Sequence, residues 1–311
     1  MDESALALKK AKNRRIARET AMLYLFMLPG ILVLFFFNYR PLYGVLIAFQ
    51  DYLPGRPIIG EGVRWVGLKH VKHFMSSYFF WRLIRNTLVL SAMNLVFVFP
   101  IPILFALTIN EIVWPKTKKI IQTITYLPHF ISTVVVAGMV STFLANDGII
   151  TLILRFFGLQ VSELNTSAVA FPWIYTCIKI WQTFGWSSIL YLSTISAIDP
   201  GLYEAAEIDG ASRLQRIWNI TVPALLPMIM IQLILFIGSV LGNDSGLILL
   251  LYNPATYETA DVIGTYTYRE GLLGAQFSSG TAIGLFMSII GFILTFISNK
   301  VSDKTTGFAI W

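Results

Sequence analysis

The chain has 311 residues, of which 56% are hydrophobic and only 13% are charged, and its mean hydropathy is +0.68. A soluble domain carries about 25% charged residues, so the composition excludes an ordinary soluble protein. Apolar runs of about 20 residues recur along the whole length, and that length crosses a bilayer as a helix. The sequence therefore predicts an all-α, polytopic membrane protein. Its net charge of +6 then reflects lipid headgroups and topology rather than nucleic acid.

Six spans are predicted in chain order. The first follows the basic stretch KKAKNRRIAR, and no small-residue cleavage site comes after it, so it is interpreted as a retained signal anchor. The single cysteine, Cys177, excludes an internal disulfide and is expected to be a small buried hydrophobe. The spans cover about Met22–Phe37, Asn86–Ile109, Ile121–Leu144, Ala168–Ser193, Val222–Leu241 and Thr281–Ser298.

Basic residues between the spans predict the orientation. Thirteen of the 23 Lys and Arg residues fall in Met1–Ala21, Asn110–Ile120, the 197–221 loop and the C-terminal tail. These short segments alternate with longer ones that hold nine, and the positive-inside rule places the denser set in the cytoplasm. The predicted organisation is a cytoplasmic N-terminal segment (1–21), a six-helix domain (22–299) and a cytoplasmic tail (300–311).

A polar loop at 199–223 interrupts the two long apolar segments on either side of it. Asp199 followed by proline is a helix-start signal, and Gly210 supplies a left-handed stop about ten residues later. Ser212 and Gln215 have the spacing of a capping box that starts a second helix. Packing in the membrane would need only a short turn here. The loop is therefore predicted to present a helix pair to a partner.

The source of energy for any transport must lie outside this chain. No predicted span has Asp or Glu in its core, as coupling to protons or sodium usually requires, and the sequence lacks a P-loop for ATP. Lys179 is the one charged residue near a span interior. It either lines the path of an anionic substrate or serves a structural role by pairing or snorkelling, and the sequence leaves both readings open.

Other functional classes find less support. A membrane enzyme would need a polar catalytic cluster, whereas His129 has no evident catalytic partner in the sequence. His70 and His73 share a helical spacing, but no carboxylate or cysteine completes a metal site, so none is predicted. The alternative to an ATP-driven system is a secondary carrier or a permease for another small polar solute.

The stretch EAAEIDGASRLQRIWNITVPALLP resembles the EAA motif of binding-protein-dependent ABC importer permeases. Ile217 departs from this pattern, because carbohydrate-importer relatives commonly carry Phe there, and the smaller side chain weakens that predicted docking contact. The residues that fall on the motif are Glu204, Ala205, Ala206, Asp209, Gly210, Ala211 and Pro223.

Matches elsewhere resemble one branch of that family, the LplB-like permeases of polysaccharide and oligosaccharide uptake. They extend over nearly the whole length and imply a type I importer (MetI-like) permease fold with cytoplasmic coupling helices. Alginate- or pectin-derived oligosaccharides would fit this branch. The matching segments include NYRPLYGVLIAFQDY, WVGL, NTLVLS, YLPHFIS, LYNPATYETADVIGTYTYREGL and the C-terminal GFAIW.

The resemblance implies a non-catalytic subunit in a bacterial inner membrane. Its implied partners are a second permease, two ATPase subunits that bind ATP and Mg²⁺, and an extracytoplasmic sugar-binding protein. Glu204 would contact a basic residue of the ATPase, Ala205 and Ala206 would keep the helix thin, and Arg213 and Arg216 are further candidates for that surface.

Residues of the substrate path are less evident from the sequence. Aromatic, amide and hydroxyl groups on the fourth span have the chemistry of sugar sites, but tryptophan is also enriched at membrane interfaces, and the structural reading is favoured for most of them. Interfacial anchoring explains Trp173 well, and Trp173 and Tyr191 lie a turn or more away from the other candidates on this span. The candidates are Lys179, Trp181, Gln182 and Trp186 on the fourth span, and Asn243, Asp244, Tyr252 and Asn253 near the outer end of the fifth.

Overall fold

The computed structural model describes residues 3–158 and 163–311. Met1 and Asp2 of the predicted N-terminal segment, and residues 159–162 of a predicted outer loop, lie outside this description. Within the described ranges the chain is helical, and the only β-pairing is an isolated bridge between Gln50 and Trp65. The all-α prediction is confirmed.

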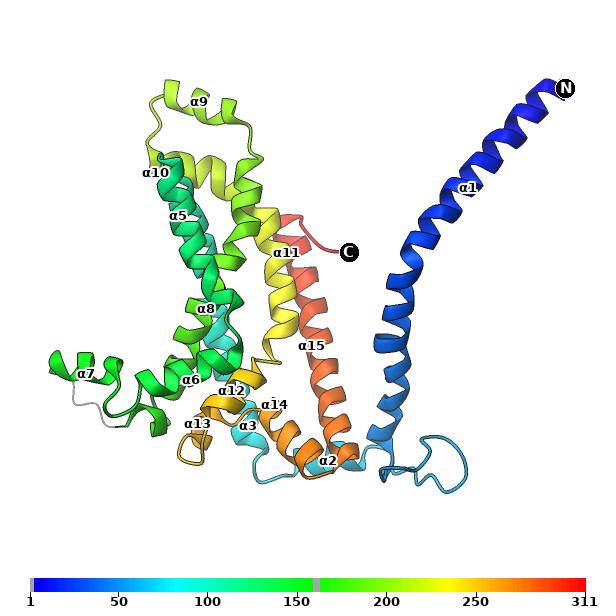
Figure 1. Ribbon diagram of the computed structural model, residues 1–311, viewed down its shortest axis with the longest axis vertical. Helices are drawn as coiled ribbons and strands as arrows, with labels where there is room; N and C mark the ends of the chain where they lie inside the picture. Colours follow the sequence, from blue (N-terminus) through cyan, green and yellow to red (C-terminus); the bar gives the residue numbers. More distant parts are fainter. Residues whose placement is uncertain (1–2, 159–162) are drawn as a thin grey trace.

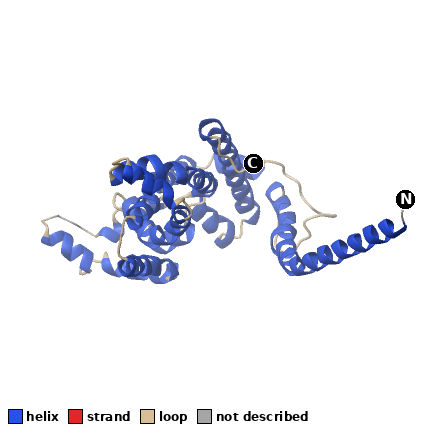
Figure 2. Cartoon of the chain, turned by 90° about the horizontal axis from the view of Figure 1, so that it is seen from above, coloured by secondary structure: helices blue, strands red, loops and turns tan. Residues whose placement is uncertain are grey.

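The first helix stands apart from the other helices (Figures 1 and 2). Helix α1 (Glu3–Leu34) continues through a π-helical turn, η1 (Phe35–Tyr39), into the 3₁₀ segment η2 (Arg40–Phe49). The resulting stretch Ile16–Phe49 is apolar enough to cross a membrane, yet its most apolar window has no buried residue. Lipid or another subunit must therefore cover this helix, because the chain itself does not.

Four long helical stretches form the rest of the bundle (Figure 1). Close approach between them relies on small residues, since Gly238 on α11 lies directly against Thr295 on α15. Prolines lie in the first turn of α4 and of α8, where the missing N–H is not needed. The stretches are α3–η3–α4 (Phe80–Met93, Asn94–Val98 and Pro100–Asn110), α8 (Phe171–Ser196), α11 (Val222–Val240) and α15 (Phe277–Thr306).

Four of the predicted spans coincide with helices that are long and apolar enough to cross a membrane. These are the first, second, fifth and sixth predicted spans. The described residues contain one more such helix only if the bent pair Pro115–Phe130 and Thr133–Phe143 is taken as a single span. The predicted fourth span corresponds to α8, a single helix of 26 residues that is too polar to meet that hydropathy criterion. The total of six spans stays a prediction.

The predicted third span, at about Ile121–Leu144, is not a single straight helix, and whether it crosses the membrane stays a prediction. The structure has α5 (Pro115–Tyr126) and α6 (Thr133–Phe143), and the chain bends by 99° between them. Pro128 removes a backbone donor within the short 3₁₀ turn after α5, and the Ser132 side chain caps the new helix by accepting from the Val135 amide. Local capping therefore overrides the continuous apolar run.

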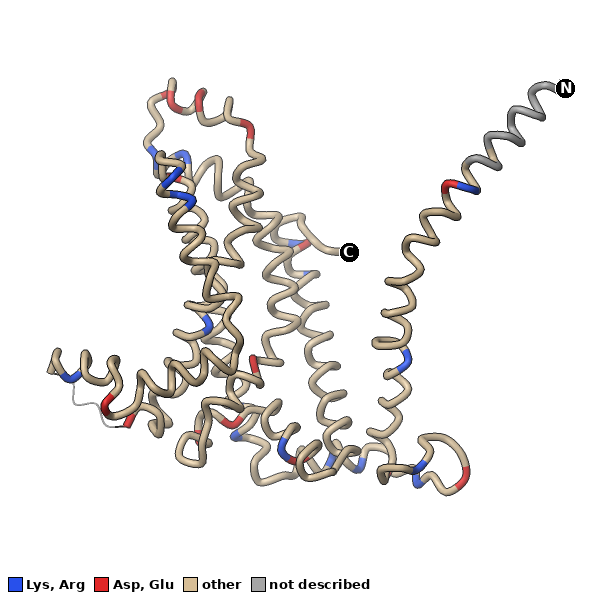
Figure 3. Tube along the Cα trace, in the orientation of Figure 1, with Lys and Arg blue, Asp and Glu red and all other residues tan. Residues whose placement is uncertain are grey.

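The short helices gather at two opposite ends of the bundle (Figure 1). We call them the α9 end and the α2 end, and Figure 3 shows that most charged residues lie near one or the other. Helices α9 (Pro200–Ile208) and α10 (Arg213–Arg216) form the first. The α2 end holds α2 (Lys69–Met75), α7 (Ile149–Phe156), η5 (Leu164–Thr166), α12 (Ser245–Leu251), α13 (Tyr257–Ala260), α14 (Ile263–Tyr266) and η7 (Thr267–Leu273).

The expectation that the single cysteine is buried is wrong. Cys177 is exposed on α8 rather than buried, and it lines an apolar hollow between α6, α7 and α8. The core of the bundle lies on other faces of α8, where Tyr175 and Ile178 pack against Leu247. The lipid-facing surface of a span can carry a cysteine as easily as the interior, because both are apolar.

Candidate functional site

The projecting loop has the local structure that its sequence predicts. Asp199 caps α9 by accepting from the Gly201 amide, and proline occupies the first turn. Gly210 adopts a φ of 76°, the left-handed conformation that disfavours a side chain. Ser212 and Gln215 form the reciprocal capping box at the start of α10. The predicted helix, turn and second helix are therefore confirmed.

Two side-chain contacts tie this helix pair together and to the start of α11. The hydroxyl groups of Tyr203 and Thr221 lie 2.9 Å apart, and Arg216 Nη1 lies 2.9 Å from Glu207 Oε2. The first joins α9 to the π-helical turn η6 (Ile217–Thr221), which leads directly into α11. A force on α9 therefore acts on α8 and α11 together.

The motif residues lie mostly on the outside of this helix pair. Glu204, Ala205, Asp209 and Gly210 are exposed, and the Glu204 carboxylate has no partner within the described residues. Partly covered are Ala206, Ala211 and Ile217, whereas Arg213 and Pro223 are exposed. Unlike Arg213, the side chain of Arg216 is already engaged within the chain.

Exposed apolar side chains on the same helix pair were missed by the sequence analysis. Ile208 is 87% exposed, and Leu202, Leu214 and Trp218 are each more than half exposed. Such side chains at a projecting tip are typical of a contact surface. The available signal was the presence of large apolar residues in a short, otherwise polar loop.

A cavity of about 570 Å³ lies on the side of the bundle between η3–α4, α8 and α11. One wall is α8, with Lys179, Thr183 and Trp186 at helical spacing. The opposite wall is α11, which contributes Gln232 and Ser239. Most of the lining is apolar, and it also includes aromatic rings, hydroxyl groups, an amide and one cation.

Lys179 is paired within the chain. Its Nζ lies 3.2 Å from Asp244 Oδ2, and the side chains of the two residues are 21% and 31% exposed. Asp244 Oδ1 also accepts from the Leu247 amide at 3.1 Å and so caps α12. The pairing role that the sequence left open is therefore present, and it coexists with the position of Lys179 in the cavity wall.

The structure separates the other candidate path residues. Trp181 lines the apolar hollow that contains Cys177, and Gln182 is buried and donates to the carbonyl of Ile131 at 3.4 Å. Asn243 and Asn253 are fixed by backbone contacts, the first to Thr87 O and the second to Asn165 O, while the ring of Tyr252 packs against Tyr257. Of the eight candidates, Lys179 and Trp186 lie in the cavity, and Asp244 lies beside it.

His129 has a partner that the sequence did not reveal. Its ring stacks on Trp186 with centroids 4.7 Å apart and an angle of 1° between the planes. His129 lies in the 3₁₀ turn that follows α5, and both this turn and α5 pack against α8. No signal in a single sequence predicts such a contact, because 57 residues separate the two side chains.

A buried carboxylate holds the α2 end together. Asp261 is fully buried and accepts from both terminal nitrogens of Arg269, at 3.2 and 2.9 Å, and from Arg82 at 3.3 Å. Hydrogen bonding to this carboxylate raises the pKa of Arg269. Thr265 adds a hydroxyl donor at 2.8 Å. Removal of the carboxylate would leave partly buried cations without compensation.

The described residues thus form a helical membrane bundle with a cavity between η3–α4, α8 and α11 and a projecting helix pair at one end. Across residues 3–158 and 163–311 there is no group of three or more His, Cys, Asp or Glu residues that could hold a metal. The chain belongs to the family of binding-protein-dependent transport system inner membrane components, which matches residues 12–307.

Curated relatives agree with that assignment. The chain is 41% identical over 304 residues to the polygalacturonan/rhamnogalacturonan transport system permease protein YteP of Bacillus subtilis (strain 168), covering 96% of this chain and 94% of YteP. It is 40% identical over 284 residues to protein LplB of the same organism, with 91% and 88% covered. The predicted resemblance to LplB-like permeases is confirmed, and the named relative YteP is a transport component rather than an enzyme.

A solved structure confirms the predicted permease fold. One chain of a bacterial ABC transporter involved in the import of the acidic polysaccharide alginate superimposes with a TM-score of 0.85 at 40% identity. The match covers 95% of this chain and 99% of that one. The helical arrangement described above is therefore shared over almost the whole length.

Proposed function

We propose that this chain is a permease subunit of an ATP-driven, binding-protein-dependent importer of oligosaccharides or polysaccharides. The observation that carries the proposal is the exposed α9–α10 pair with its EAA residues, joined to α8 at one side and to α11 at the other. The saccharide class is supported by the name of YteP and by the alginate transporter structure.

In this proposal the helix pair couples transport to ATP. ATP and Mg²⁺ bind to two ATPase subunits, and closure of the ATPase dimer moves the docked helices as rigid levers. Glu204 forms a charge-assisted bond with a basic ATPase residue, and Arg213 contacts the same surface. The exposed side chain of Ile208 enters an apolar pocket of the ATPase, which compensates for the small Ile217.

We further propose six spans, with both termini and the α9 end in the cytoplasm of a bacterial cell. The bent pair α5–α6 then forms the third span, and α8 forms the fourth despite its polar residues. Segment 1–21 and the tail 300–311 flank the six-helix domain 22–299. The basic residues of α5 lie near the α9 end, in agreement with the positive-inside rule (Figure 3).

A second permease completes the path. The most apolar part of α1 lacks cover from its own chain, so this surface fits a partner subunit, which would also close the cavity between η3–α4, α8 and α11. A saccharide-binding protein delivers cargo at the α2 end. In the cavity, Trp186 would stack on a sugar face while Gln232 and Thr183 would bind hydroxyl groups. Lys179 would contact acidic groups, while the candidates outside the cavity would act indirectly.

The coupling role is tested with Glu204→Lys and Gly210→Val. A β-branched residue at a φ of 76° is strained, so the second change should distort the turn. Both should abolish saccharide uptake and ATPase stimulation by the loaded binding protein, with normal membrane insertion and binding-protein docking. Glu111→Lys, outside the helix pair, is the matched charge reversal and should retain uptake. Survival of uptake and stimulation in both variants would contradict the proposed docking.

A further inference from the structure

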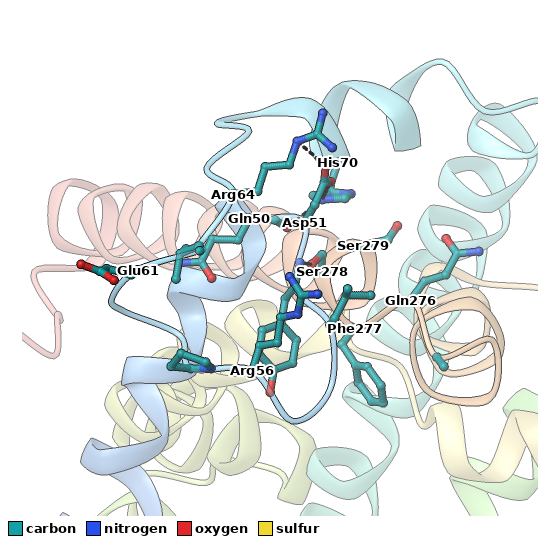
Figure 4. Close-up of a pocket in the computed structure, with 16 residues that line it drawn as sticks. Gln50, Asp51, Arg56, Glu61, Arg64, His70, Gln276, Phe277, Ser278 and Ser279 are labelled. Carbon is teal, nitrogen blue, oxygen red and sulfur yellow. Dashed lines mark hydrogen bonds and ion pairs between the residues drawn. The ribbon is translucent and has the colours of Figure 1, made fainter.

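A second polar cavity lies at the α2 end, opposite the coupling helices (Figure 4). Its volume is about 640 Å³, within the range of roughly 300–1,000 Å³ typical of small-ligand sites. The walls are the loop 50–64, the start of α2 and residues 275–279 at the beginning of α15. None of these residues belongs to the coupling helices or to the side cavity.

The carboxylate in one wall of this cavity is already paired with cations of the same chain. The Asp51 carboxylate accepts from Lys69 Nζ at 2.8 and 2.9 Å and also lies near Arg64 and His70. Hydrogen bonding to Lys69 holds the pKa of Asp51 below its ordinary value of 3.8. Asp51 is therefore ionised at neutral pH and paired with neighbouring cationic side chains of the same chain. Its role is to hold the loop against α2.

The opposite part of the cavity has donors without partners. Figure 4 shows Arg56 pointing into the cavity toward Ser278, whereas Glu61 points away. In the described part of the chain no carboxylate lies within ion-pair distance of Arg56. Arg56 and Gln276 are exposed and Ser279 is only 7% exposed, and neither the Ser279 hydroxyl nor the Gln276 side-chain amide has a hydrogen-bond partner among the contacts described. These groups are free to bind a ligand.

Aromatic rings complete the lining. Tyr52 and Phe277 both contribute to the cavity, one from the loop and one from the start of α15. The Tyr52 amide donates to Ser278 Oγ at 2.9 Å, which joins the two walls and fixes their spacing. Rings beside an amide, a hydroxyl and a guanidinium suit a sugar that bears a carboxylate: the rings pack on its apolar face and the guanidinium binds the acid.

The charge of the surrounding segment supports an anionic ligand. Residues 38–85 hold seven Lys and Arg residues against two acidic residues, a net charge of +5 out of the +6 of the whole chain. In the orientation proposed above this segment is extracytoplasmic, where the positive-inside rule gives no reason for such an excess. A field of this sign raises the local concentration of anions near the cavity.

We propose that this cavity is an entry site for the uronic-acid units of an acidic oligosaccharide, with Arg56 as the residue that binds the carboxylate. The inference rests on the proposed saccharide importer and adds a binding site on this chain for the acidic units that the names of its relatives imply. A concave, ring-lined hollow fits a sugar better than it fits the flat surface of a docked protein. The sugar carboxylate pairs with Arg56, while Gln276 and Ser279 bind ring hydroxyl groups.

The test uses the complete complex, with its partner permease and ATPases, in lipid nanodiscs without binding protein. Calorimetry measures binding of trimers of galacturonic acid and of mannuronic acid, and of their neutral methyl esters. At least one acidic trimer should bind about tenfold tighter than its ester, since a charge-assisted bond is lost in the ester. Arg56→Ala should abolish that difference, and Arg56→Lys should retain part of it. Lys72→Ala removes an exposed charge outside the cavity and should change affinity less than about twofold.

Equal binding by wild type and Arg56→Ala, or equal affinity for acid and ester, would overturn the proposal. So would an Arg56→Ala variant that loses only docking of the binding protein, because the cavity would then be a protein contact. ATP-driven uptake into proteoliposomes distinguishes a failure of the entry site from a failure of the proposed importer function. If wild type takes up saccharides and Arg56→Ala does not change the uptake, the proposed entry site alone is wrong. If wild type takes up none of them, the proposed function is wrong.

Discussion

The contact between α5 and α8 is a close helix crossing that a single substitution can probe. A Cβ atom at Gly185 would lie 2.1 Å from the carbonyl oxygen of Thr125 and 2.5 Å from its carbon. Both obstacles are backbone atoms, so no side-chain rotation relieves the clash. Ordinary contact needs more than 3 Å, and the two helices would therefore have to separate by about 1 Å. Gly185→Ala should overpack this crossing.

Overpacking of this kind costs about 1–3 kcal/mol, which should lower the Tm of the purified complex by several degrees. Because α8 leads directly into α9, the same displacement should also weaken ATPase stimulation by the loaded binding protein. Gly284→Ala on α15 is the matched control, since a Cβ there meets nothing within 4 Å. Thermal unfolding in nanodiscs compares the two. A Tm for Gly185→Ala equal to that of the control would refute the proposed close crossing.

Two further predictions concern charged groups. Lys179→Met and Asp244→Asn should each lower the Tm, and the double variant should lose less than their sum, with a coupling of about 0.5–3 kcal/mol; strict additivity would mean that the pair contributes nothing. Asp51→Asn should speed hydrogen exchange in residues 50–69 at neutral pH. In wild type the stabilisation that Asp51 gives to this segment is complete above the unfolded pKa of 3.8. It is lost as the pH falls through the lower pKa of the folded state. Loss of protection between pH 7 and 5 would contradict this assignment.

Local signals predicted the coupling loop well. Helix caps, a proline in the first turn and a left-handed glycine each depend on a few neighbouring residues, so Asp199, Gly210 and the Ser212 capping box are legible in the sequence. Four long apolar stretches are predicted for a similar reason, because hydropathy summed over about 20 residues is a strong signal.

Contacts between distant segments could not be predicted in the same way. The bend after Pro128 was missed because the apolar run continues through it, although the proline was itself a warning. Asp261 forms an ion pair with Arg82, which lies 179 residues away in the sequence, and the residues around Asp261 do not indicate that its carboxylate is buried. Both cavities combine side chains from segments that are far apart in sequence, so their chemistry is visible only once the helices are placed.

The linkage between coupling helices and cavity limits how the proposed mechanism can operate. The Tyr203–Thr221 contact ties α9 to the start of α11, and α8 ends only a few residues before α9 begins. The cavity walls that carry Lys179 and Gln232 are these same two helices. A displacement imposed on α9 must therefore move both walls together instead of opening one against the other. The change in the width of the path then has to come from motion relative to η3–α4 and to the partner permease. In the proposed mechanism, one subunit alone therefore cannot alternate access, and a second permease is needed.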